Sequence, residues 1–169
     1  MSYAMHRVFC AAPGDLEEER QAFYKVMGEF NETKAMPRGV LFVSVSLPAT
    51  VFDKRPYQAV LGENIRSCRY YIQLLEDTWG PPQKNFERDY ALASKCAADP
   101  EMPMQQVAIL FKKPLLPQQV EPGVAELRQC LAAENAAAFR EFDTVTEYRR
   151  HLHDLLSSWL PTVAAAAGA

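Results

Sequence analysis

The alternation of strand-like and helix-like patterns along the chain constrains its fold more than any other feature. Five short apolar runs, rich in β-branched and aromatic residues, are separated by segments whose apolar residues recur at helical spacing. The predicted strands are residues 7–11, 39–47, 69–75, 106–112 and 137–142. Strands that alternate with helices in this way form a parallel sheet covered by helices on both faces.

The connections between these strands narrow the topology further. Right-handed crossovers between five parallel strands favour a three-layer α/β, flavodoxin-like fold with the strand order 2-1-3-4-5. Ligands of such folds bind beyond the carboxyl ends of the strands, where the strand order reverses between strands 1 and 3. We therefore expect the functional loops to be residues 12–15, 48–56 and 76–87.

Several residues predict where helices begin and end. Asp15 with Glu18, and Thr144 with Glu147, have the spacing of a capping box at a helix start. Pro161 is expected to end the last helix, because proline lacks the backbone N–H that an interior position must donate. The 169 residues therefore predict one α/β domain over residues 1–160 and a disordered, alanine-rich tail over residues 161–169.

The composition limits the classes of function. A content of 49% hydrophobic and 23% charged residues is typical of a globular protein that folds without a metal or disulfide. The net charge of -3 argues against duplex nucleic acid as a partner, because proteins that bind duplexes carry a strongly basic face. The apolar runs are too short to span a membrane and no signal peptide is visible, so a cytoplasmic protein without a membrane partner is expected.

Several motifs that would identify a chemistry are missing from the sequence. There is no glycine-rich dinucleotide fingerprint, no phosphate-binding P-loop and no serine nucleophile elbow. His151 and His153 are two residues apart on a predicted helix, so they point to different faces and do not form a metal site. The four cysteines have no CxxC spacing and are predicted to be buried thiols: Cys10, Cys68, Cys96 and Cys130. No cofactor is predicted.

Two segments carry a resemblance to a known family. Residues 8–20 read VFCAAPGDLEEER, and residues 65–93 read IRSCRYYIQLLEDTWGPPQKNFERDYALA. Together they resemble Toll/interleukin-1 receptor-like (TIR-like) domains, in the bacterial branch that opens with Ser-Pro-Gly-Asp-Leu and continues with Glu-Arg. The residues that match the opening motif are Pro13, Gly14, Asp15, Leu16, Glu19 and Arg20. Gly80 and the acidic cluster 87–90 match the turn and helix start after the third strand.

The resemblance implies an activity and a site. Many TIR domains cleave the bond between nicotinamide and ribose in NAD, with a catalytic glutamate that corresponds here to Glu87. One carboxylate suffices for this chemistry, because nicotinamide leaves without protonation and the carboxylate stabilises the oxocarbenium-like ribose. Asp89 is the alternative carboxylate, and it lies about 200° around the helix from Glu87.

A substrate pocket is expected around this carboxylate. The start of the first helix, residues 14–16, is the candidate site for a diphosphate, because free amide groups there favour anions. Trp79 and Tyr57 are candidates to stack on a base, although half-buried packing is the simpler interpretation. The predicted substrate-binding residues are Ala12, Gly14, Asp15, Asp53, Arg55, Tyr57 and Trp79. A helix cap for Asp15 and a solvated loop position for Arg55 are the structural alternatives.

Two departures from the family pattern concern the same site. Ala11 and Ala12 replace two serines that are usual in the branch, so two hydroxyl groups are absent from the expected pocket floor. TIR enzymes often have a tryptophan shortly before the catalytic glutamate, whereas Trp79 lies eight positions before Glu87.

Two other functions remain open. The first is a non-catalytic signalling module that self-associates or binds a separate effector through surface helices and the loop 48–56. The second is a nucleoside deoxyribosyltransferase-like enzyme, whose glutamate motif resembles Phe86-Glu87 followed by Tyr90-Ala91. The resemblance implies a bacterial protein of a defence or stress-signalling pathway, with NAD or a related nucleotide as the expected substrate.

Overall fold

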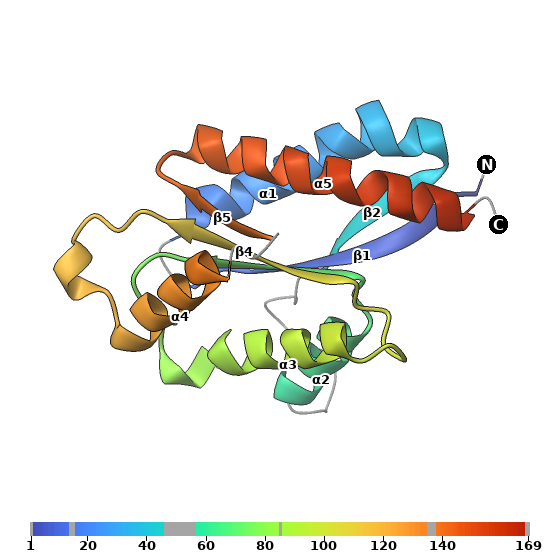
Figure 1. Ribbon diagram of the computed structural model, residues 1–169. Helices are drawn as coiled ribbons and strands as arrows, with labels where there is room; N and C mark the ends of the chain where they lie inside the picture. The colour runs from blue at the N-terminus through green and yellow to red at the C-terminus, as the bar shows by residue number, and fades with distance from the viewer. Residues whose placement is uncertain (1, 14–15, 46–56, 85, 135–137, 168–169) are drawn as a thin grey trace.

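The computed structural model describes residues 2–13, 16–45, 57–84, 86–134 and 138–167 (Figure 1). A five-stranded parallel sheet runs through the middle of the molecule in the order β2-β1-β3-β4-β5. Its strands are β1 (Ala4–Ala11), β2 (Val40–Val45), β3 (Tyr70–Leu75), β4 (Gln106–Lys112) and β5 (Phe139–Phe142). The predicted fold class and strand order are therefore confirmed.

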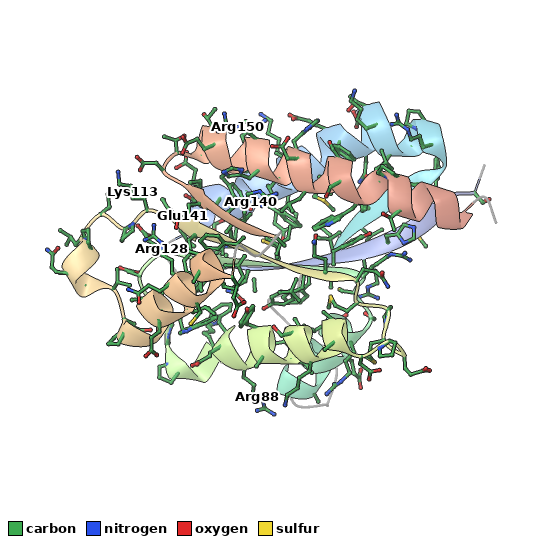
Figure 2. All side chains as sticks on the ribbon, viewed as in Figure 1. Arg88, Lys113, Arg128, Arg140, Glu141 and Arg150 are labelled. Carbon is green, nitrogen blue, oxygen red and sulfur yellow. The ribbon has the colours of Figure 1, made fainter. Side chains whose placement is uncertain are left out.

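Helices cover both faces of this sheet. Helices α1 (Glu17–Phe30) and α5 (Val145–Ala167) lie side by side on one face, whereas α2 (Tyr57–Arg66), α3 (Phe86–Ala98) and α4 (Pro122–Ala133) lie on the other (Figure 1). Arg128 of α4 donates two hydrogen bonds of 2.9 Å to the carboxylate of Glu141 in β5, and these join α4 to the sheet edge (Figure 2). Among the described helices, none is long and apolar enough to cross a membrane.

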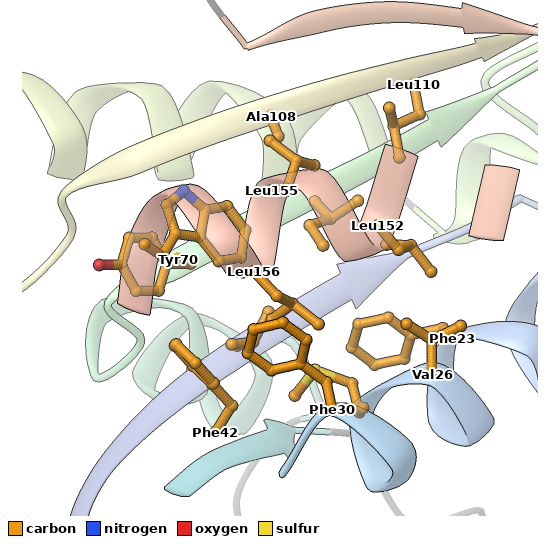
Figure 3. Close-up of a cluster of buried hydrophobic side chains, with 14 of the residues drawn as sticks. Phe23, Val26, Phe30, Phe42, Tyr70, Ala108, Leu110, Leu152, Leu155 and Leu156 are labelled. Atoms are coloured by element: carbon orange, nitrogen blue, oxygen red, sulfur yellow. The ribbon is translucent and has the colours of Figure 1, made fainter. Parts of the chain in front are cut away.

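The face under α1 and α5 holds the larger apolar core (Figure 3). The predicted stripe of α1 is buried there, with Phe23 and Phe30 packed against α5 and the strands. The ring of Tyr70 stacks on Trp159 with centroids 4.0 Å apart and planes 7° apart. The indole Nε1 of Trp159 also donates a hydrogen bond of 2.6 Å to Gln106 of β4, so α5 is held to the sheet by both packing and a polar contact.

The opposite face has a smaller core under α2 and α3. Phe9 of β1 and Tyr71 of β3 stack there with ring centroids 5.5 Å apart and planes 4° apart. Leu61 and Ile65 of α2 and Ala93 of α3 pack over them. Because side chains alternate along a strand, the neighbours of Phe9 and Tyr71 point to the other core.

One of the two predicted capping boxes is observed at the start of a helix. The capping box at α5 is confirmed, because Glu147 N–H donates to Thr144 Oγ1 at 3.2 Å and Thr144 N–H donates to Glu147 Oε2 at 3.3 Å. Helix α1 begins at Glu17, and its N-cap residue is Leu16, which makes no side-chain capping hydrogen bond. A cap at Asp15 would have started the helix one residue earlier. Asp15 itself lies outside the described residues.

Two expectations about individual residues are wrong. Helix α5 does not end at Pro161 but continues to Ala167. One missing backbone donor is outweighed by the anchoring of the buried Trp159 and Leu160 before it and by the high helix propensity of the alanines after it. Cys130 is exposed on α4 rather than buried, because few α4 side chains reach the core.

Candidate functional site

The strand order brings the segments after β1 and β3 together at the carboxyl edge of the sheet. Pro13 and Leu16 meet the segment 76–81 across a pocket of about 200 Å³. Gly80 has a φ of +80°, and a Cβ at this position would lie 3.3 Å from Cβ of Pro13. Both the positive φ and the close approach to Pro13 favour glycine at this turn.

Glu121 fixes the conformation of the turn after β3. Its carboxylate accepts hydrogen bonds from Thr78 Oγ1 at 2.7 Å and from the backbone N–H of Trp79 at 3.1 Å. Its own N–H donates to the carbonyl of Asp77 at 2.7 Å. Sequence reasoning missed this residue, although Pro122 at the first position of α4 marks Glu121 as the residue before a helix.

A larger groove of about 490 Å³ runs along the outer side of this turn. It is lined by Trp79, Gly80, Pro81, Pro82, Phe86, Glu87, Arg88, Ala91 and Glu121. Glu87 is exposed on the groove wall, in the first turn of α3. Arg88 projects from α3 away from the sheet (Figure 2). The predicted catalytic carboxylate therefore lies beside a space that could hold part of a nucleotide.

Trp79 forms one wall of this groove. Its ring packs against Tyr90 of α3, with centroids 5.7 Å apart and planes tilted by 36°. The side chain is partly buried, so it both packs on α3 and presents a surface to the groove. Stacking on a base and structural packing are thus compatible for this residue.

Ala12 is the one remaining predicted substrate-binding residue whose side chain the structure describes. Ala12 is 5% exposed and packs in the core under α1 and α5, while its carbonyl accepts a hydrogen bond of 2.7 Å from Arg20. Gly14, Asp15, Asp53 and Arg55 lie outside the described residues. Tyr57 is the first residue of α2, and its side chain is also outside them.

Acidic residues at the start of α1 make it a less favourable site for the predicted diphosphate. Glu17, Glu18 and Glu19 occupy the first turn of the helix. Glu19 is buried and its carboxylate lies 2.7 Å from Nζ of Lys112, while Arg20 pairs with Glu17 at 2.9 Å. Because these carboxylates already complement the positive end of the helix, they weaken its attraction for a further anion.

Asp89 is a second carboxyl group, buried on the inner face of α3. It is 6% exposed, whereas Glu87 is exposed, so the expected placement of the two residues on different faces of α3 is confirmed. Burial raises the pKa of Asp89 to about 6, against a smaller opposite effect of the Arg88 guanidinium. In the part of the chain that the structure describes, no hydrogen bond or ion pair satisfies this carboxyl group.

The described residues were compared with the ligand groups of metal sites and with known proteins. None of their His, Cys, Asp and Glu side chains forms a group of three that could hold a metal ion. No protein-family model matches the chain, and no curated protein is similar enough in sequence to count as a match. The arrangement itself offers carboxyl groups, aromatic surfaces and a groove at the carboxyl edge of a parallel sheet.

Proposed function

We propose that this protein is a TIR-like glycohydrolase that cleaves the nicotinamide–ribose bond of NAD or the equivalent bond of a related nucleotide. The observation that carries the proposal is the position of Glu87 on a groove of about 490 Å³, in the first turn of α3, the helix that follows β3. This is the edge of the sheet where strand order reverses and where ligands of such folds bind. The sequence resemblance supports the same residue.

The groove has features that suit this chemistry. Trp79 and Phe86 supply apolar surface on which a flat base can rest. The Glu87 carboxylate can stabilise positive charge that develops on a ribose during bond cleavage. Arg88 and Glu121 add one positive and one negative side chain to the lining of the groove.

The direct test is release of nicotinamide from NAD by the purified full chain at high protein concentration. We expect Glu87→Gln to lower the rate by about 100-fold or more, because the amide cannot stabilise a cationic ribose. Glu101→Gln is the matched control, since Glu101 is an exposed glutamate in the turn before β4, at the opposite edge of the sheet. Equal turnover by the wild type and Glu87→Gln would exclude Glu87 as the catalytic group.

The same reaction can distinguish the deoxyribosyltransferase-like alternative. An enzyme of that type transfers deoxyribose from one base to another, so it exchanges bases when two are supplied. We expect hydrolysis without base exchange. Exchange between a deoxynucleoside and a free base would instead favour the transferase.

A docking module is the second candidate function, and one observation favours it. Leu115 is 90% exposed and Leu116 is 47% exposed in the connection between β4 and α4. The two adjacent leucines place apolar side chains on the surface, where a second protein can cover them. If the domain self-associates through them, Leu115→Ser with Leu116→Ser lowers the mass measured by light scattering. An unchanged mass would remove this pair from any self-association surface.

A further inference from the structure

Glu121, the residue before α4, is held against the turn after β3 and also lines the groove of Glu87. One carboxylate oxygen accepts a hydrogen bond from Thr78 Oγ1 at 2.7 Å, and the other accepts one from the backbone N–H of Trp79 at 3.1 Å. The backbone N–H of Glu121 donates to the carbonyl of Asp77 at 2.7 Å. Main chain and side chain are thus tied to the same turn, and the carboxylate has a fixed position at the groove.

The hydrogen bonds to the turn leave part of this carboxylate unused. A carboxylate has about four lone-pair sites, and the two donors of the turn occupy one site on each oxygen. Among the described residues, no lysine or arginine forms an ion pair with Glu121, and the residue is exposed. An acceptor therefore remains on each oxygen, in a residue that lines the groove.

The unused acceptors define which ligand groups can bind there. Carboxylate oxygens only accept hydrogen bonds, so they bind hydroxyl groups and repel phosphate oxygens. The two oxygens of one carboxylate can accept from two neighbouring hydroxyls, and the 2′ and 3′ hydroxyls of a ribose are such a pair. The aromatic rings of Trp79 and Phe86 line the same groove, where a base can rest beside that ribose.

We propose that Glu121 is a substrate-binding residue that accepts hydrogen bonds from the 2′ and 3′ hydroxyls of the ribose on which Glu87 acts. The inference rests on the proposed glycohydrolase function and narrows its substrate to ribonucleotides, against 2′-deoxyribonucleotides. Glu121 takes no part in breaking the bond. It decides which sugar the groove holds, because a sugar without the 2′ hydroxyl leaves one of its acceptors without a donor.

Glu121→Gln separates contact with the sugar from support of the turn. The glutamine oxygen can still accept from the Trp79 N–H, and its NH₂ group can donate to Thr78 Oγ1, so the turn keeps both hydrogen bonds. The charge and an acceptor for the sugar are lost. Thr78→Val is the opposite control, because it weakens the turn, including the 3.0 Å contact with the Gly80 N–H, and leaves the carboxylate. Glu126→Gln, at an exposed position of α4, controls for the loss of one negative charge.

The kinetic test compares NAD with an analogue that lacks the 2′ hydroxyl of the nicotinamide ribose. The quantity measured is the ratio of kcat/KM for NAD to kcat/KM for the analogue. The different intrinsic reactivity of the two bonds cancels when this ratio is compared between wild type and variant. We expect Glu121→Gln to lower the ratio by about 10-fold or more, because a hydrogen bond from a hydroxyl to a charged acceptor is lost.

The controls distinguish contact with the sugar from a purely structural role. Thr78→Val and Glu126→Gln should leave the ratio unchanged, even where Thr78→Val lowers kcat/KM for both substrates. Equal losses on NAD and the analogue in Glu121→Gln, or no loss on either, would overturn the sugar contact. A wild-type preference for the deoxy analogue would also overturn it.

Calorimetric titration of NAD and the analogue into the Glu87→Gln variant gives the same comparison without cleavage. We expect NAD to bind more tightly than the analogue, and the addition of Glu121→Gln to remove most of this difference. That binding preference without cleavage by the wild type would contradict the proposed function and retain the ribose contact. Cleavage of NAD with a preference that Glu121→Gln leaves unchanged would do the reverse. If NAD is neither bound nor cleaved, both are overturned.

Discussion

At the scale of single residues, the burial of Asp89 lowers the free energy of unfolding at neutral pH, and this loss can be measured. Its pKa is raised from an ordinary value of 3.8 to about 6 in the folded chain, chiefly by burial. The folded state therefore binds the proton more tightly than the unfolded state, and stability falls as the pH rises between these two values. Above pH 6 the burial of the charge costs about 3 kcal/mol, from the size of the shift.

This cost predicts that Asp89→Asn stabilises the protein at neutral pH. We expect the free energy of unfolding in urea to rise by about 1 to 3 kcal/mol at pH 7.5 and to change little at pH 4. Asp154→Asn on the exposed side of α5 is the control for removing one negative charge. A variant that is less stable than the wild type at pH 7.5 would show that the carboxylate has a favourable partner.

At the scale of elements, the contact between Lys112 and Glu19 joins the end of β4 to the first turn of α1. The two charged groups are 2.7 Å apart, and the Glu19 side chain is 2% exposed. Lys112→Met should lower the free energy of unfolding by about 3 kcal/mol, because it leaves a buried carboxylate without a cation. Adding Glu19→Gln should recover much of that loss. Additive effects of the two substitutions in a urea double-mutant cycle would exclude a direct coupling.

The elements themselves could largely be predicted from the sequence, because their signals are local. The apolar run of β4 is observed with its predicted ends, Gln106–Lys112, and the Thr144–Glu147 box starts α5 as expected. Local signals failed where a distant contact decides the outcome. Pro161 was expected to end the last helix, but the stacking of Trp159 on Tyr70 anchors the turn before it, the alanines after it favour helix, and α5 continues to Ala167.

Less of the candidate site could be predicted from the sequence, because contacts between residues far apart in the chain decide its geometry. Helical geometry alone predicted that Glu87 and Asp89 face different ways. It could not show that Glu121, far along the chain, holds the turn at Thr78, or that the buried Tyr71 hydroxyl donates a hydrogen bond to Oε1 of Gln73. These hydrogen bonds depend on which strands become neighbours and on how deep each side chain lies.

At the scale of the whole molecule, the distribution of burial predicts unequal local stability. Strand β3 pairs on both sides and all six of its residues are buried, whereas β5 has four residues and pairs only with β4. Among the described residues of α4, Val124 alone is buried. In native-state hydrogen exchange we expect the amides of β3 to open only with global unfolding. Those of α4 and β5 should exchange faster by local opening, since few apolar contacts oppose it. Protection of α4 equal to that of β3 would instead mean that this end of the molecule unfolds with the rest, as a single cooperative unit.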